Sequence, residues 1–203
     1  WPDYRRDARF MYLAKTATED RRFALKRATD EAHARVEGIV QNAGMFGSRE
    51  GFRRYLTATF DMRTRYERLL DRNGAERVWP EWPGRRIAGL VAQDIADLGG
   101  ADPGGGTDMP AENVQSTLSP GEIIGILYVL EGSSLGARVL VKSVADMGLT
   151  ATFGARHLFK QAGDRDAWRS FVSMMLAAPE APCHKAARAT FDAFATAYRK
   201  AAD

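Results

Sequence analysis

Residues 119–146 have the sequence SPGEIIGILYVLEGSSLGARVLVKSVAD, and this stretch decides the fold. Ser119 and Glu122 have the spacing of a capping box, and the proline between them suits the first turn of a helix. Large apolar side chains then recur at helical spacing along one side. They are Ile123, Ile126, Leu127, Leu130 and Val141. The stretch therefore predicts a long core helix.

The same stretch carries four glycines, Gly121, Gly125, Gly132 and Gly136. In a helix they fall within about 60° of one another on one face. Each costs roughly 1 kcal/mol of helix stability relative to alanine, so something is expected to approach this backbone closely. Either another helix packs on the strip or a flat ligand lies across it. A membrane dimerisation motif is excluded, because the longest uninterrupted apolar run, residues 126–130, is far shorter than the roughly 20 residues of a membrane span.

The helical period continues through most of the chain. Amphipathic helices are expected over residues 19–43, 49–72, 85–98, 164–178 and 183–201. Ser48 is the expected N-cap of the second. Residues 99–120, rich in Gly, Pro, Asp and Asn, are expected to form a mobile loop, and residues 147–154 a turn. No segment alternates as a strand does. We predict an all-α, single-domain helical bundle over residues 19–203, preceded by an N-terminal extension of residues 1–18.

Composition sets further bounds. The 203 residues include 45% hydrophobic and 27% charged residues, as in ordinary globular domains, and the net charge is +3. Basic and aromatic residues near the N-terminus would suit nucleic acid, but we expect an extension that packs on the bundle or stays mobile, and no nucleic-acid or membrane partner. The single cysteine, Cys183, cannot form an internal disulfide, so a cytoplasmic location is expected.

His33 is the candidate metal ligand. It shares the apolar side of its predicted helix with Leu25, Thr29 and Val40, and a lone histidine on such a face is usually a satisfied core residue. Glu37 lies one turn further on, where a carboxylate can bond the far ring nitrogen of a metal-bound imidazole. The spacing alone leaves both interpretations open.

Together, the two segments resemble the haem oxygenase family. Residues 25–37, LKRATDEAHARVE, are similar to the family's proximal helix, whose pattern is Leu-x-x-x-Thr-x-x-x-His-x-x-x-Glu. Residues 128–140, YVLEGSSLGARVL, are similar to its distal helix in the bacterial form. The resemblance implies an enzyme that opens haem to biliverdin, releasing iron and carbon monoxide. It also implies that haem is both substrate and cofactor, that molecular oxygen is consumed, and that a separate reductase or ferredoxin is the electron donor.

The resemblance also implies residue roles. The expected catalytic residues are His33 as the proximal iron ligand and, on the distal side, Gly132, Ser133 and Gly136. The expected haem contacts are Lys26, Thr29, Glu37, Tyr128, Lys142 and Arg169. Among these, Lys26 and Tyr128 match the family's propionate contacts, and Glu37 is the partner of the imidazole. Ser133 stands where mammalian members have an aspartate. In this position the chain departs from the mammalian form and resembles the bacterial branch.

The alternative hypothesis is a non-catalytic protein of the same fold that holds haem or another ligand. The presence of both His33 and the glycine strip favours turnover. We expect a monomer or weak dimer.

Overall fold

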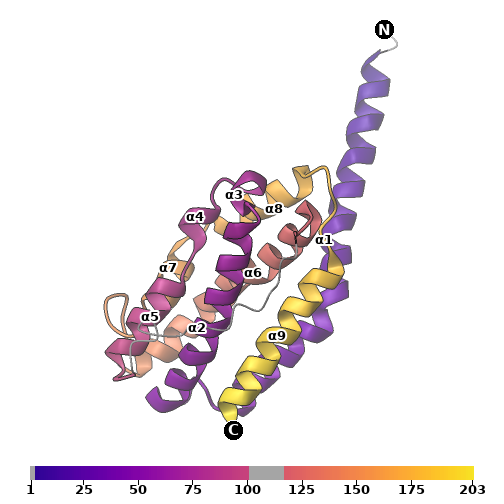
Figure 1. Ribbon diagram of the computed structural model, residues 1–203. Coiled ribbons are helices and arrows are strands. Elements are labelled where there is room, and N and C mark those ends of the chain that lie inside the picture. Colours follow the sequence, from indigo (N-terminus) through magenta and orange to yellow (C-terminus); the bar gives the residue numbers. More distant parts are fainter. Residues whose placement is uncertain (1–2, 101–116) are drawn as a thin grey trace.

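The computed structural model describes the backbone of residues 3–100 and 117–203, with side chains described from Arg21 onward. Within these residues the chain forms helices and no strand, apart from isolated bridges between Thr150 and residues 153 and 154. The helices are α1 (Asp3–Asn42), α2 (Arg49–Arg72), α3 (Ala75–Val78), α4 (Trp82–Arg85), α5 (Ala88–Asp97), α6 (Pro120–Asp146), α7 (Arg156–Gly163), α8 (Ala167–Ala177) and α9 (His184–Ala202) (Figure 1). The all-α prediction is confirmed. Most of the expected loop over 99–120 lies outside the described residues.

Where the sequence carries a local capping signal, the observed start of the helix agrees with the prediction. At the start of α6, Glu122 N–H donates to the Ser119 hydroxyl at 3.3 Å, and Ser119 N–H donates to the Glu122 carboxylate at 2.9 Å. Ser48 caps α2 by accepting from Gly51 N–H at 3.0 Å. The start of α1 differs, because this helix begins at Asp3 and runs on without a break through the expected boundary at residue 19.

The sequence pattern does not predict α7, and the structure supplies the reason. No side chain of its own segment caps this helix. Instead the Asp94 carboxylate of α5 accepts from the backbone N–H groups of Arg156 and His157 at 2.9 and 3.1 Å. The N-terminus of α5 is capped in the same way by Glu67 of α2, which accepts from Ile87 N–H at 2.9 Å. Caps supplied by a distant helix leave no trace in local periodicity.

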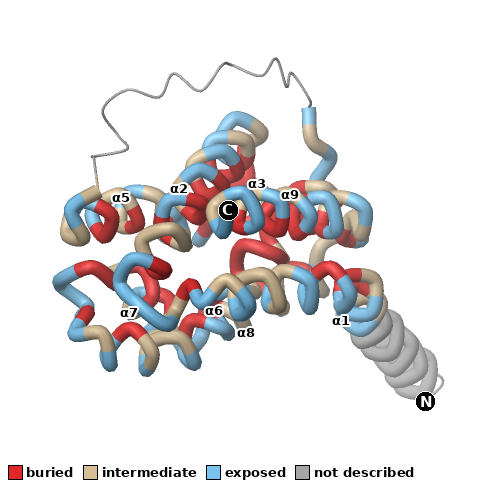
Figure 2. The backbone as a smooth tube through the Cα atoms, turned by 90° about the horizontal axis from the view of Figure 1, so that it is seen from below, coloured by how far each residue is buried: buried red, intermediate tan, exposed pale blue. Residues whose placement is uncertain are grey.

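The helices form two layers with most buried residues between them (Figure 2). One layer contains α2, α5 and α9, and the other contains α1, α6, α7 and α8. The interior holds two apolar clusters, and α6 contributes to both. Its residues up to Leu130 belong to the larger cluster, whereas Ala137 and Val144 belong to the smaller one. The segment between them, which carries Gly132 and Gly136, is therefore a junction between two cores.

Within the described residues, α6 alone is long and apolar enough to cross a membrane by composition. In this fold 56% of its most apolar window is buried by other parts of the protein. Burial among neighbouring helices accounts for that apolar character, as in the core helix of a globular bundle.

Candidate active site

The imidazole of His33 is not part of the core. Leu25 and Thr29 on the same helix are buried, but the side chain of His33 is 54% exposed. The interpretation of His33 as a satisfied core histidine is therefore wrong. Its Nδ1 atom lies 3.7 Å from Oε2 of Glu37, whose side chain is 68% exposed. That distance is too long for a direct hydrogen bond, so Glu37 is near the imidazole without holding it.

A second group contacts the imidazole from α9. The rings of His33 and Phe191 meet edge to face, with centroids 5.5 Å apart and an interplanar angle of 85°. Such pairs contribute about 0.5–1.5 kcal/mol beyond the area that they bury. Next to Phe191, Asp192 accepts from Arg35 of α1 at 2.6 Å. The helix that carries His33 is thus tied to α9 directly beside the imidazole.

The glycine strip of α6 divides into two halves with different surroundings. A Cβ atom at Gly121 would lie 2.6 Å from the carbonyl oxygen of Ala181, and one at Gly125 would lie 2.5 Å from that of Cys183. These two glycines admit the beginning of α9, so close helix packing is the correct explanation for the first half. The sequence left helix packing and a flat ligand open as explanations for the strip, and the flat-ligand explanation is wrong for Gly121 and Gly125. Because α9 packs on these two glycines, they are not available to a ligand.

The second half of the strip is open. A Cβ atom at Gly136 would meet nothing within 4 Å, and one at Gly132 would meet only Trp168, at an ordinary 3.8 Å. On the same face of α6, within about 100° of the glycines, Leu135 is 42% exposed and Val139 is 75% exposed. Exposed apolar side chains beside bare backbone form a surface that suits a flat apolar ligand.

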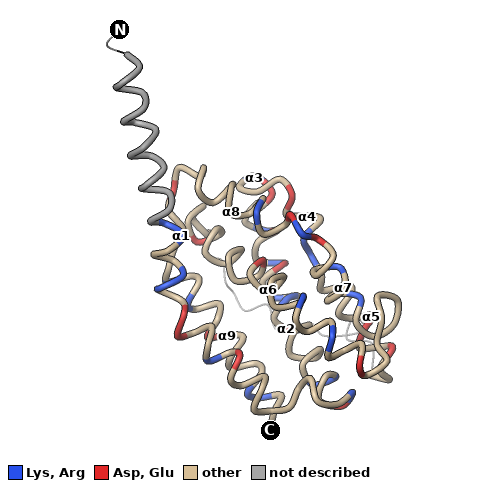
Figure 3. Tube along the Cα trace, turned by 180° about the vertical axis from the view of Figure 1, so that it is seen from behind, with Lys and Arg blue, Asp and Glu red and all other residues tan. Residues whose placement is uncertain are grey.

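The two open surfaces lie on helices that meet at one end. Tyr128 of α6 interacts with the hydroxyl of Thr29 on α1, and burial raises the pKa of the Tyr128 phenol. Each of these residues is one turn before its own helix reaches the open surface, at His33 on α1 and at Gly132 on α6. Beyond this meeting point α1 runs beside α9, and α6 takes a different direction (Figures 1 and 3). The imidazole and the bare glycines thus lie on the diverging arms of a V.

The expected propionate contacts differ in position. Lys26 lies near the Thr29–Tyr128 contact, and its ammonium donates to both oxygens of Asp30, at 2.8 and 3.0 Å. That hydrogen bond to Asp30 raises the pKa of Lys26. Lys142 is exposed further along α6. Arg169, on α8, has an 80% exposed side chain and pairs with Asp166 at 3.1 Å. The structure therefore brings Lys26, Thr29 and Tyr128 together, and it gives Lys142 and Arg169 no such contact with them.

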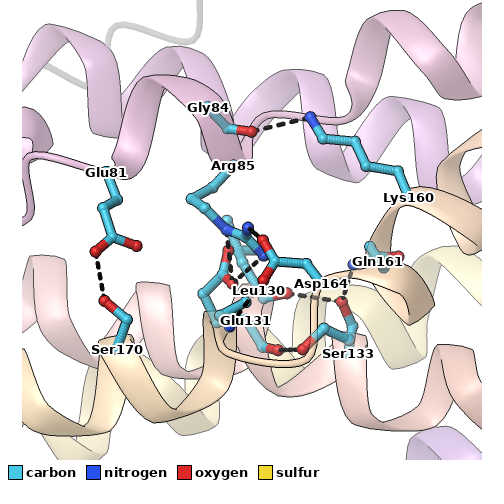
Figure 4. Close-up of polar contacts among 12 residues, drawn as sticks. Glu81, Gly84, Arg85, Leu130, Glu131, Ser133, Lys160, Gln161, Asp164 and Ser170 are labelled. Carbon is cyan, nitrogen blue, oxygen red and sulfur yellow. Dashed lines mark hydrogen bonds and ion pairs between the residues drawn. The ribbon is translucent and has the colours of Figure 1, made fainter.

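Ser133, one residue after Gly132, is hydrogen-bonded to its own helix and to α7. Its hydroxyl donates to the carbonyl of Leu130 at 2.6 Å and accepts from the side-chain amide of Gln161 on α7 at 2.8 Å (Figure 4). Ser134 likewise donates to the Glu131 carbonyl at 2.7 Å. Serine hydroxyls that bond back to their own helix commonly accompany a bend. Ser133 thus links the glycine segment to α7.

A buried charged cluster anchors this segment, and the sequence analysis missed it. The guanidinium of Arg85 donates to the Glu131 carboxylate at 3.0 Å and also pairs with Asp164 (Figure 4). Burial raises the pKa of Glu131, and the neighbouring Arg85 opposes that shift. Arg63 of α2 donates to the Leu130 carbonyl at 3.3 Å. The signal available in the sequence was Glu131 itself, because a lone carboxylate after an apolar run needs a cationic partner when buried.

His157 is a buried histidine on α7, and its sequence context alone would fit a surface residue or a packing residue. It is a packing residue, stacked against the rings of Phe52 and Tyr55. Its Nδ1 atom lies 2.7 Å from the carboxylate of Asp94, and burial lowers the pKa of the imidazole. His157 therefore belongs to the α5–α7 contact and not to the open surfaces.

The charges of the described residues do not form one large patch. Basic and acidic residues alternate over the helices (Figure 3). The described residues also hold no cluster of three or more His, Cys, Asp and Glu that would bind a metal ion by itself. An exposed imidazole on α1 and an open glycine surface on α6 instead suit a metal that arrives within its own macrocycle.

Comparison with known proteins shows the family of this chain. No protein-family model matches the chain. The haem oxygenase PigA of Pseudomonas aeruginosa is 35% identical over 152 residues, which cover 74% of this chain and 75% of that protein. This chain belongs to the haem oxygenase family. As a haem oxygenase, it is an enzyme that degrades haem.

The fold of this haem oxygenase is shared with a solved structure. The NO- and CO-bound haem oxygenase of Neisseria meningitidis aligns with a TM-score of 0.74 at 26% identity, covering 88% of this chain and 90% of that one. The expectations of an all-α haem oxygenase fold and of a haem-degrading enzyme are thereby confirmed.

Proposed function

We propose that haem lies between α1 and α6, with His33 as its iron ligand and with Gly132 and Gly136 against the opposite face. The observation that carries the proposal is that both surfaces are open, since His33 is more than half exposed and a Cβ at Gly136 would meet no atom within 4 Å. Haem would cover the exposed side chains of Leu135 and Val139 and remove them from water.

When bound, haem supplies both the iron that activates molecular oxygen and the ring carbon that is oxidised. The contribution of the chain is mainly geometric. His33 binds from one side, and the bare backbone of α6 limits the space on the other. The buried partners of Glu131 hold that backbone in position, and Ser133 acts indirectly through Gln161. The products are biliverdin, iron and carbon monoxide.

The propionates would lie where α1 and α6 meet. Lys26, Thr29 and Tyr128 provide an ammonium and two hydroxyls there. A propionate has to compete with Asp30 for Lys26, but exposed pairs of this kind are weak. Lys142 and Arg169 remain secondary candidates, because side chains this exposed are free to reorient toward the edge of haem.

The remaining features of the proposal concern partners. The chain has no flavin or nicotinamide fingerprint, so a separate reductase or ferredoxin would deliver the electrons. A cytoplasmic location and a monomeric or weakly dimeric state complete the proposal. The lone Cys183 caps α9 by accepting from Ala186 N–H at 3.4 Å, which suits a reduced thiol.

The test is to add haemin and then a reductant in air, with catalase present. We expect a Soret band that decays into a biliverdin spectrum.

His33→Ala should abolish histidine-ligated haem, whereas His184→Ala, at the start of α9, is the matched control and should behave like the parent. Gly136→Leu should block the distal side and leave histidine ligation intact. A stable Soret band in the parent would support the non-catalytic alternative, and an unchanged spectrum in His33→Ala would refute the ligand assignment.

A further inference from the structure

The proposed haem site leaves one question of geometry, namely what sets the rotation of the His33 imidazole. Rotation about the bond to iron decides which porphyrin nitrogens the imidazole plane is aligned with. A metal-bound histidine is normally oriented by a carboxylate or carbonyl that accepts from its other ring nitrogen. Here the nearest carboxylate, Glu37, is 3.7 Å from Nδ1 and lies on an exposed, flexible side chain.

Phe191 is better placed to restrain that rotation. Its ring meets the imidazole edge to face at 5.5 Å, and its side chain is 8% exposed within the larger apolar core. A buried ring has few alternative rotamers, because close packing leaves no space for them. Arg35 and Asp192 hold the two helices together at this level.

The helix that carries Phe191 is itself anchored to the distal helix. The Cys183 N–H at the start of α9 donates to the Gly121 carbonyl at 2.7 Å. The close approach at Gly125 brings the next turn against α6. Further along, the hydroxyls of Tyr198 and Thr59 lie 2.9 Å apart and connect α9 to α2. Phe191 therefore stands at a defined position relative to both arms of the V.

We infer that Phe191 is the positioning residue that sets the orientation of the His33 imidazole, and that Glu37 has the lesser part. The inference rests on the proposed function, because it requires that His33 ligates the iron. In this role Phe191 acts through the imidazole of His33. It acts by excluding rotations of the imidazole that would bring the two rings into collision.

The experiment compares Phe191→Leu with Phe194→Leu, a matched change on α9 at a ring that contacts Tyr66 and Tyr198. Each protein is reconstituted with haemin. The readouts are the g values of the ferric azide form in electron paramagnetic resonance and the iron–histidine stretching band of the ferrous form in resonance Raman. We expect a shifted or split signal in Phe191→Leu, parental signals in Phe194→Leu, and a smaller change in Glu37→Gln than in Phe191→Leu.

Parental g values and Raman band in Phe191→Leu would overturn the inference, as would a larger change in Glu37→Gln. A parent protein without any histidine-ligated spectrum would instead refute the proposed function, so the two failures are distinguishable. If the leucine variant folds poorly, NMR of the haem-free parent provides a second test. In the haem-free parent, the ring protons of His33 should show an NMR ring-current shift from Phe191. This shift should be lost in Phe191→Leu and kept in Phe194→Leu. Its absence in the folded parent would also overturn the inference.

Discussion

Alanine at Gly125 and at Gly136 should have opposite consequences, although both glycines lie on one face of one helix. Each substitution adds the same methyl group and the same gain in helix propensity, about 1 kcal/mol. At Gly136 the methyl group meets no atom within 4 Å. Gly136→Ala should therefore raise the free energy of unfolding of the haem-free protein by about 0.5–1 kcal/mol.

At Gly125 the same methyl group would lie 2.5 Å from the Cys183 carbonyl oxygen and 3.3 Å from the Ala187 nitrogen. Those two atoms are joined by the first hydrogen bond of α9, at 3.1 Å, so neither is free to move alone. Relief requires α9 to retreat from α6, and overpacking of this kind costs about 1–3 kcal/mol. Because the propensity gain is common to both variants, Gly125→Ala should be less stable than Gly136→Ala by about 1–3 kcal/mol.

The assay is urea denaturation of both haem-free variants and the parent, followed by far-UV circular dichroism. In a chain of this length each kcal/mol corresponds to about 2–4 °C in Tm, so thermal unfolding gives a second measurement. Equal stability of the two variants would refute the division of the glycine strip into a packed half and an open half. So would a loss of stability in Gly136→Ala, because it would mean that this position is already covered.

Two further predictions concern buried ionisable groups. Arg85→Met leaves the Glu131 carboxylate without its main partner and should lower the free energy of unfolding by about 3–5 kcal/mol. Urea denaturation measures this loss of stability. A loss below about 1 kcal/mol, as for an exposed pair, would contradict the prediction. Burial lowers the pKa of His157, so below the ordinary histidine pKa of about 6.5 the unfolded chain binds a proton that the folded protein does not. Stability should accordingly fall as the pH drops from about 7 to about 5.5, and the slope should be shallower in His157→Gln. An equal slope in the two proteins would show that another group is responsible.

Much of the fold could be predicted because its determinants are local. The capping box at Ser119 and Glu122 and the N-cap at Ser48 involve atoms within three residues of one another, and the apolar period acts over one or two helical turns. The same applies to the candidate site. The resemblance on which His33 and the open glycines were selected rests on two short motifs, and their roles remain proposals.

The features that escaped prediction depend on partners that are distant in the sequence. Helix α7 begins where Asp94, from another helix, accepts its first N–H groups. Glu131 reads as an interruption of an apolar run until Arg85 is placed beside it. Phe191 reads as one more core aromatic residue until α9 brings it against His33.

By itself, then, the sequence determined that this chain is a bundle of amphipathic helices with one imidazole and one bare strip of backbone. Only the tertiary structure decided that Gly121 and Gly125 admit α9 while Gly132 and Gly136 stay open, and that His33 faces outward. The reason is physical. A helical pattern specifies which residues share a face, because that follows from the rotation per residue, but what covers the face depends on how distant segments pack together.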